Sequence, residues 1–384
     1  MTRLPGRNPR LVALIALGIA NHTALGGSRV VITLEALRLG ASTAVVGVLL
    51  ALYALLPMVF AVATGRLSDR VGVRRPMLVG SVALAAGSAL PAVVPGFAAL
   101  FVSATVVGVG FMLFQVPAQN ATGEMGPPED RAHNFSLLAL GYSISGFFGP
   151  LVAGLTIDHG GFAAAFAVLA LLPVVPAVVL ARGRLPLPGP HPARAGGHAG
   201  GALELVTHRK LRWVFFVNAL LAIGWDLHTI VIPVYGAKIG LSASAIGLIL
   251  ASFAAATFVV RFSMRWIVRH ANERQVLRAS LLIAGAVYLL FPFSDGAPTL
   301  MALSFCLGLG LGMSQPMVMS LLHSHAPPGR MGEAAGVRMS LVQAMAVAVP
   351  LAFGALGATA GLTPVFWSVG ACLAAGGLLA KRAR

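Results

Sequence analysis

The stretch GRLSDRVGVRR, residues 65–75, determines how the rest of the chain is interpreted. It places one carboxylate and four arginines between two long apolar segments. Charge at this density cannot lie in hydrocarbon, because each ionised group inside a bilayer is expensive. The stretch is therefore predicted to be a tight polar turn at a membrane surface.

The spacing within this stretch resembles the signature loop between the second and third helices of the major facilitator superfamily. The matching positions are Gly65, Leu67, Asp69, Arg70, Gly72 and Arg74, and one departure is Val73, where the family usually has a basic residue. The resemblance implies a membrane transporter. It also implies that Asp69 latches the cytoplasmic face near residues 332–335, at the start of the eleventh helix, where the helix dipole attracts a carboxylate. Arg70 or Arg74 is then expected to pair with Glu124.

The composition excludes an ordinary soluble protein. Of the 384 residues, 58% are hydrophobic and 10% are charged, whereas soluble domains carry roughly 25% charged residues. A net charge of +16 is typical of nucleic-acid-binding proteins, but here the arginines lie between apolar segments instead of gathering on one face. Both cysteines lie in apolar runs, so the sequence predicts no disulfide framework, metal site or cofactor.

Twelve apolar runs are long enough to cross a bilayer as helices, since a crossing needs about 20 residues. They cover residues 11–36, 43–65, 76–94, 97–120, 134–156, 161–182, 211–236, 243–264, 275–293, 298–323, 334–357 and 362–381. The predicted fold is an all-α membrane protein, with twelve transmembrane helices in two six-helix bundles. We predict an N-terminal lobe at 1–182, a cytoplasmic linker at 183–209 and a C-terminal lobe at 210–384.

The basic residues predict the orientation. With twelve crossings, 24 of the 27 Lys and Arg residues fall on the side of the two termini. By the positive-inside rule both termini are then cytoplasmic. We expect a multi-pass protein of the plasma membrane, in a bacterium the inner membrane. Its expected partners are the lipid bilayer, a small-molecule substrate and coupling protons, with no nucleic acid, and it is expected to be a monomer.

The two halves are a repeat with one unbroken offset of 200 residues. Pairs that superpose are Gly40 and Gly240, Gly47 and Gly247, Gly108 and Gly308, Gln115 and Gln315, Pro150 and Pro350, and Phe166 and Phe366. This is a parallel duplication of a six-helix unit, as expected of the two halves in this superfamily. It is independent of the signature loop.

A second resemblance lies in the fifth predicted helix. Gly149, Pro150 and Gly154 are similar to the core of the Gly-Pro motif of antiporters and drug exporters in this superfamily. The upstream glycines of that motif fall on Ser136 and Ser145. Small residues here also permit close helix packing and a kink, so a purely structural role and an exporter-specific role both remain open.

Ionisable and polar groups at membrane depth are candidates for function by default. In the first helix these are Asn21, His22 and Arg29, and in the seventh Asn218, Trp225, Asp226 and His228. Asp226 has three possible roles: an ion pair with Arg29 at an outer gate, a proton carrier, or a helix contact without a part in transport. The resemblance implies that helices one, four, seven and ten line the central cavity. Helices four and ten then add Gln115, Gln119 and Gln315.

No nucleotide-binding loop and no nucleophile–base or metal-ligand spacing appears, so we predict neither an ATP-driven pump nor an enzyme. The leading hypothesis is a secondary active transporter working by alternating access, a proton-coupled antiporter for efflux of small organic or drug-like molecules. The alternative is an uptake permease for a small anionic metabolite bound by Arg29 and the histidines. A non-transporting membrane sensor is a third class, which the intact loop at 65–75 disfavours.

Overall fold

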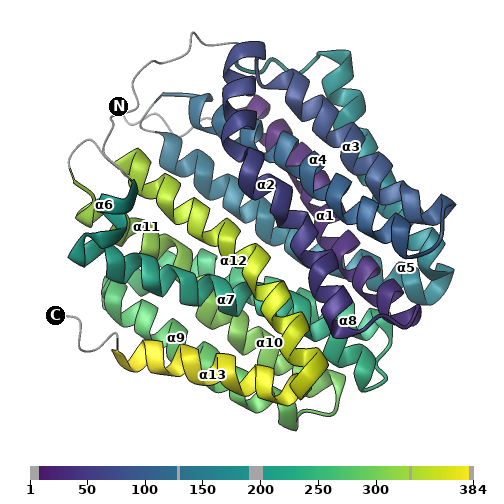
Figure 1. The fold of residues 1–384 in the computed structure, drawn as a ribbon. Coiled ribbons are helices and arrows are strands. Elements are labelled where there is room, and N and C mark those ends of the chain that lie inside the picture. Colours follow the sequence, from purple (N-terminus) through teal and green to yellow (C-terminus); the bar gives the residue numbers. More distant parts are fainter. Residues whose placement is uncertain (1–7, 128–129, 190–201, 328–330, 380–384) are drawn as a thin grey trace. The chain divides into compact units, whose positions relative to one another are not determined.

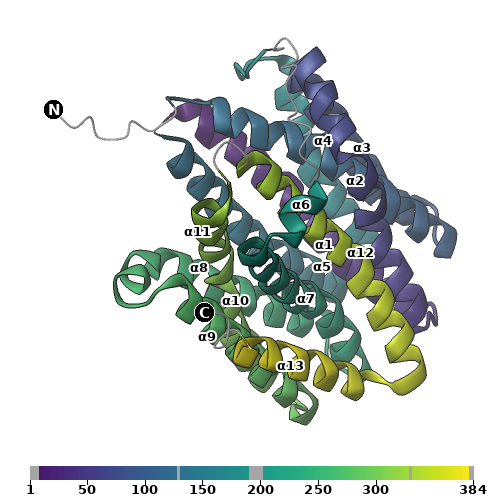
Figure 2. The same ribbon diagram turned by 60° about the vertical axis from the view of Figure 1, so that its left-hand side comes forward.

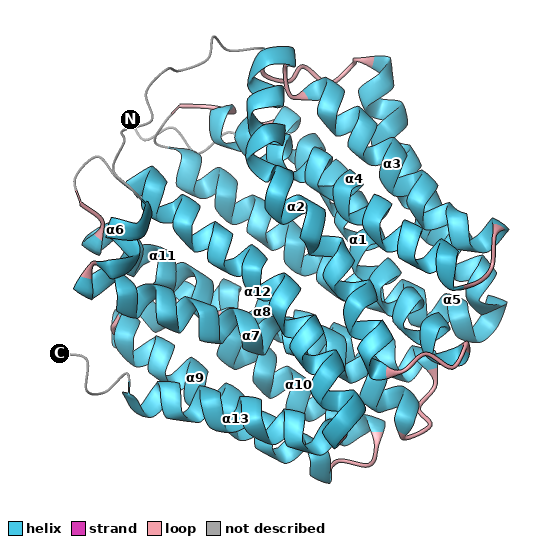
Figure 3. Cartoon of the chain, in the orientation of Figure 1, coloured by secondary structure: helices cyan, strands magenta, loops and turns pink. Residues whose placement is uncertain are grey.

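The computed structural model describes residues 8–127, 130–189, 202–327 and 331–379. Within these ranges the regular structure is helical and no strand occurs (Figures 1 and 3). Eleven helical segments of the described chain are long and apolar enough to cross a membrane. The prediction of an all-α membrane protein is therefore confirmed.

The first half of the chain contains five helices. They are α1 (Pro9–Arg38), α2 (Thr43–Val71), α3 (Arg74–Val93), α4 (Phe97–Glu124) and α5 (Arg131–Arg182). The helix α5 contains the two crossings predicted at 134–156 and 161–182, joined without a loop. They meet at Gly161, whose φ of 77° and ψ of 178° are not helical. A residue with a Cβ would be strained there, and glycine is not.

The second half contains one short helix, α6 (Ala202–Thr207), inside the predicted linker, followed by the membrane helices. These are α7 (Arg209–Lys238), α8 (Ala243–His270), α9 (Glu273–Leu290), α10 (Ala297–Gly312), α11 (Ser314–His325), α12 (Met331–Ala360) and α13 (Leu362–Leu379), with a 3₁₀ turn at Phe291–Phe293. The crossing predicted at 298–323 is divided between α10 and α11, which meet at Met313.

The helix bounds repeat with the offset found in the sequence. The helices α1 and α7 each have 30 residues, and α7 begins and ends 200 residues after α1. The turns repeat as well: Gly40 and Gly240 have φ of 85° and 77°, and Gly161 and Gly361 have φ of 77° and 82°. Backbone geometry thus follows the same duplication as the residue identities.

Contacts divide the chain into two compact units, which we describe separately. The first unit comprises Met1–Leu39 and Leu52–Ala195, and the second comprises Gly40–Ala51 and Gly196–Arg384. In the first unit α5 packs on α1 and α3, and α3 packs on α4; in the second, α13 lies along α9, as Figure 2 also shows. The lobe boundaries at 182 and 210 stay predictions.

The charged stretch at 65–75 is mostly helical, which corrects the predicted turn. The helix α2 continues through Gly65 to Val71, and the reversal is confined to Gly72, with φ of 81°, and Val73. Arginine side chains at a helix end can extend into water without ending the helix, so the density of charge did not locate the turn. Val73 is 5% exposed and packs in the core with Met77 and Leu180.

Two glycines allow α1 and α5 to cross at close range. A Cβ added to Gly149 would lie 2.9 Å from the Thr23 carbonyl oxygen and 3.0 Å from the Gly27 nitrogen. A Cβ at Gly27 would in turn lie 2.9 Å from the Gly149 carbonyl oxygen. Small residues let helix backbones approach in this way. The contact gives the Gly-Pro motif of α5 a packing role at Gly149, which Pro150 follows directly and Gly154 follows after more than one turn.

Candidate functional site

The first unit holds a polar cluster around His22 of α1. The imidazole Nδ1 lies 2.9 Å from the Ser145 Oγ of α5. Its ring lies between Phe111 of α4 and Tyr142 of α5, with centroid distances of 5.4 and 5.1 Å. Three helices therefore position one imidazole.

Ser145 of α5 is the hydrogen-bond partner of the His22 ring. Its Oγ lies 2.9 Å from the Gly141 carbonyl oxygen and 2.9 Å from His22 Nδ1. With the hydroxyl proton on the carbonyl, Nδ1–H donates to Ser145 Oγ, and the neutral imidazole keeps on Nε2 a lone pair that can accept a hydrogen bond from a ligand. With the hydroxyl proton on Nδ1 the ring has the other tautomer, so the contact orients the imidazole in either case.

The glutamines of α4 join this cluster. Gln115 donates through Nε2 to the Tyr142 hydroxyl, and Gln119 interacts with the same hydroxyl. The Gln115 Oε1 is buried and has no hydrogen-bond partner among the described residues. Buried polar atoms are usually paired, so this oxygen is available to a ligand that carries a donor. The structure thus brings His22, Gln115 and Gln119 together.

Arg29 lies two turns along α1 from His22 and faces α2. Its guanidinium carbon is 5.7 Å from the centre of the Tyr53 ring, within the range of a cation–π contact. The Tyr53 hydroxyl donates to Ser28 Oγ at 3.0 Å. Asn21 has a different surrounding: it is fully buried and donates to Ser81 Oγ of α3 at 3.0 Å. Adjacent residues on a helix face different neighbours, and Asn21 ties α1 to α3.

The second unit holds an aromatic cluster around His228 of α7. This side chain is fully buried, and its Nε2 lies 3.0 Å from Ser304 Oγ of α10. Phe253 of α8 stacks on the imidazole with a centroid distance of 4.4 Å and an interplanar angle of 24°. Trp225 meets the same phenyl ring edge-on at 4.8 Å. The predicted residues Trp225 and His228 are therefore joined through Phe253, which the sequence had not singled out.

Asp226 and Gln315 are less buried than His228: Asp226 is partly buried and Gln315 is exposed. Asp226 is partly buried on α7, and its carbonyl oxygen accepts from Thr229 Oγ1 at 2.8 Å. Gln315 is exposed at the start of α11, whereas its repeat partner Gln115 is partly buried in the His22 cluster. The break at Met313 gives the two glutamines different settings although their sequence positions correspond.

Asn218 has a partner that sequence analysis did not include in the site. The buried Asn218 of α7 accepts through Oδ1 from an Arg338 guanidinium nitrogen of α12 at 3.3 Å. An arginine this close to a helix end can also extend to the membrane surface. Here it turns inward, toward an amide 120 residues away in sequence.

The signature residues at the end of α2 lie at the surface of the first unit. Asp69, Arg70 and Glu124 are exposed. Arg74 donates to the Leu180 and Ala181 carbonyl oxygens at 2.7 and 2.9 Å, so it caps the end of α5. The contact of Asp69 with residues 332–335 and the pair of Arg70 with Glu124 stay predictions.

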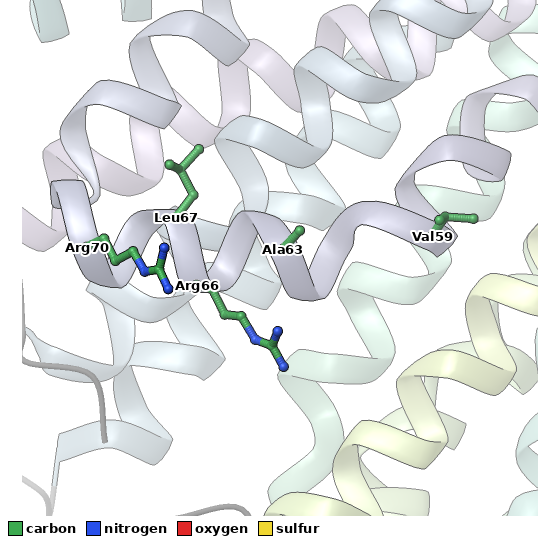
Figure 4. Close-up of a pocket in the computed structure, with 5 residues that line it drawn as sticks. All are labelled: Val59, Ala63, Arg66, Leu67 and Arg70. Carbon is green, nitrogen blue, oxygen red and sulfur yellow. The ribbon is translucent and has the colours of Figure 1, made fainter. Parts of the chain in front are cut away.

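A surface pocket of about 510 Å³ lies along the same end of α2. Figure 4 shows the side chains that line it: Val59, Ala63, Arg66, Leu67 and Arg70. The lining is apolar at Val59 and Ala63 and cationic at Arg66 and Arg70. Because the charged end of α2 is predicted to lie at the membrane surface, this pocket suits an interface more than a buried substrate site.

A duplicated, all-helical membrane bundle with polar clusters inside each unit is the architecture of a secondary transporter. A family model for the Major Facilitator Superfamily matches residues 14–350. The chain belongs to this superfamily, as the loop at 65–75 had indicated.

Two curated relatives are drug-resistance proteins. The chain is 23% identical over 349 residues to the quinolone resistance protein NorA of Staphylococcus aureus (strain MRSA252), a match that covers 88% of this chain and 87% of the relative. It is 27% identical over 338 residues to the class C tetracycline resistance protein of Escherichia coli, covering 85% and 84%.

Solved structures with the same fold are transporters of the POT family. A peptide transporter POT in complex with sulfate superposes with a TM-score of 0.80 at 18% identity, over 99% of this chain and 95% of that one. A POT family transporter in complex with 5-aminolevulinic acid gives a TM-score of 0.80 at 14% identity, over 96% and 94%. At this identity the likeness concerns the fold alone.

Proposed function

We propose that this protein is a proton-coupled exporter of small organic or drug-like molecules. The observation that carries the proposal is the similarity to two drug-resistance proteins over more than four fifths of the chain. The partial Gly-Pro motif of α5 agrees with it. The protein is a multi-pass membrane transporter, and export, proton coupling and the drug-like substrate are the proposed steps.

The chemistry of the two clusters supports an organic substrate. Around His22 a ligand meets the faces of Phe111 and Tyr142 and an unpaired amide oxygen of Gln115. Around His228 it meets the rings of Trp225 and Phe253. Pockets for organic ligands are mostly aromatic and apolar, with a few polar groups that orient the ligand.

Asp226 is the proposed proton carrier. It lies on α7, inside the window of that helix apolar enough to span the membrane. Carboxylates in transmembrane segments commonly act in proton relays. The competing role is an ion pair with Arg29 at an outer gate, which would make Asp226 part of conformational control and not of coupling.

The test uses purified protein in liposomes, with an imposed pH gradient and a pH-sensitive dye inside. Lipophilic cations, sugars and organic acids are added to wild type and to Asp226→Asn. Proton flux on addition of a cation, lost in Asp226→Asn, is the expected result. The matched control is Asp295→Asn, which removes an exposed carboxylate from the loop before α10 and leaves the flux intact.

Other results would redirect the proposal. Proton flux that persists in Asp226→Asn would show that transport is proton-coupled but that Asp226 does not carry the proton. If organic acids alone evoke flux, and Arg29→Gln abolishes it, the protein is an uptake permease for anionic metabolites and the export proposal is wrong.

A further inference from the structure

The contact between Asn218 and Arg338 leaves two hydrogen-bond donors without acceptors. Arg338 uses one guanidinium nitrogen on Asn218 Oδ1. Its Nε is buried and has no partner among the described residues, and neither has the buried Nδ2 of Asn218. Leaving such a donor unpaired in the protein interior costs about 1–3 kcal/mol. Two unpaired donors on adjoining groups indicate that an acceptor belongs there.

The duplication shows that this contact is not required by the fold. Offset by 200 residues, Asn218 corresponds to Gly18 and Arg338 to Leu138, which is 4% exposed. At these positions the first unit holds a glycine in α1 and a buried leucine in α5, where the second holds an amide in α7 and a guanidinium in α12. Apolar residues commonly replace a buried ionic contact without loss of stability. The polar pair therefore needs another explanation.

We propose that Asn218 and Arg338 form a subsite for the carboxylate of a small organic anion or zwitterion. A carboxylate offers two acceptor oxygens, one for Arg338 Nε–H and one for Asn218 Nδ2–H. Guanidinium suits this task because its donors are planar and permanently charged. The subsite implies that the substrates of the proposed transporter carry a carboxylate. It rests on the proposed function in one respect, that the protein binds small organic molecules.

Another arginine in the second unit provides an internal control. Arg278 of α9 also has a buried Nε without a partner among the described residues. The one buried amide nitrogen without a partner among the described residues is that of Asn218, which bonds Arg338, and the repeat partner of Arg278 is Leu78. An orphan Nε alone is therefore not specific, and the proposal depends on the pair of donors at α7 and α12.

Binding is measured by calorimetry on the full chain in detergent without added lipid, so that lipid phosphate does not compete. The probes are 1-naphthoate and 1-naphthamide, which differ in the carboxylate. Wild type is expected to prefer the carboxylate by about 10- to 100-fold, the range for charge-assisted hydrogen bonds. Arg338→Gln should abolish the preference, Arg338→Lys should retain part of it, and Arg278→Gln should leave it unchanged.

A double variant, Asn218→Gly with Arg338→Leu, copies the first unit and separates binding from packing. It is expected to keep the thermal unfolding midpoint of wild type and to lose the carboxylate preference. A large drop in the midpoint would show that the pair holds α7 to α12, and would overturn the subsite. Equal binding of the two probes by wild type, or no binding of 1-naphthoate, would also overturn it.

The outcome is separate from that of the transport assay. Carboxylate binding that depends on Arg338, together with no efflux of cations in liposomes, would retain the subsite and reject the exporter. Efflux of cations by a protein indifferent to the carboxylate would do the reverse.

Discussion

The two units share one backbone plan but fill corresponding positions with different chemistry. In the first unit Ser28 and Tyr53 are joined by a hydroxyl hydrogen bond of 3.0 Å. In the second unit the same positions hold His228 and Phe253, which stack at 4.4 Å. Phe253 lacks the hydroxyl of Tyr53, and the residue opposite it is the larger His228 in place of Ser28. Duplication has preserved the positions of this contact and changed its chemistry.

The helix crossings differ in the same way. The first unit brings α1 and α5 together at Gly27 and Gly149, with backbone atoms near 3 Å from an added Cβ. The corresponding residues of the second unit are Leu227 and Val349, both buried. The first unit has no side chain at these two positions, whereas the second buries a leucine and a valine there. The lesson is that a repeated fold does not imply repeated tolerance to substitution.

The largest expected effect tests that difference in tolerance. Gly149→Leu would drive a side chain into the backbone of α1 and should destabilise the protein by about 3 kcal/mol. Val349→Leu, at the corresponding position of α12, adds one methylene where a side chain already packs and should cost less, about 1 kcal/mol. Thermal unfolding midpoints of the purified proteins measure both. Similar losses in the two variants would contradict a crossing built on glycine in the first unit alone.

An intermediate effect is expected from converting the second unit's contact into that of the first. His228→Ser leaves a cavity beside Phe253 and should cost about 2 kcal/mol. Adding Phe253→Tyr recreates the pair found at Ser28 and Tyr53 and should recover about 1 kcal/mol through the hydroxyl hydrogen bond.

A double-mutant cycle on unfolding midpoints measures this coupling. Strictly additive effects would show that the two positions do not interact as the stacked geometry indicates.

The smallest effects concern the turns before α3 and α9. Gly72 has φ of 81°, so Gly72→Ala should cost about 1–2 kcal/mol through backbone strain. Its counterpart Asn272 instead forms a capping box with Gln275, and Asn272→Ala should cost about 1 kcal/mol.

The two turns should respond differently to other replacements. Asn272→Gly should lose only about a few tenths of a kcal/mol, since glycine is also accepted as an N-cap. Gly72→Val should be worse than Gly72→Ala, because a β-branched residue tolerates positive φ least. The reverse order at either site, again from unfolding midpoints, would contradict the assigned turn geometry.

The fold was largely predictable because hydropathy and the 200-residue offset are strong local signals. The helix predicted at 97–120 is observed at Phe97–Glu124, and the one at 362–381 at Leu362–Leu379. An error arose where local signals compete. The charged residues at 65–71 remain helical, although a turn was predicted there, whereas the two crossings predicted at 134–156 and 161–182 are present and meet at the non-helical Gly161.

The site was less predictable, because the direction of a side chain depends on contacts distant in sequence. The pattern indicated His22 and Gln115, but not that Tyr142 and Ser145 of α5 complete their cluster. It placed Asn21 with His22, although Asn21 faces Ser81. Arg338 lies near a helix end, where an arginine can extend to the membrane surface, and only its contact with Asn218 shows that it turns inward. The one sequence signal of this pair is that Gly18 and Leu138 stand at the corresponding positions of the first half.

The contact between Ser145 and His22 has a consequence for ligand selectivity. The hydroxyl on α5 holds the imidazole of α1 at Nδ1, so the ring is oriented before any ligand arrives and no binding free energy is spent on reorienting it. With the hydroxyl proton on the Gly141 carbonyl, the lone pair of the imidazole lies on Nε2, and this tautomer favours ligands that donate a hydrogen bond over ligands that accept one.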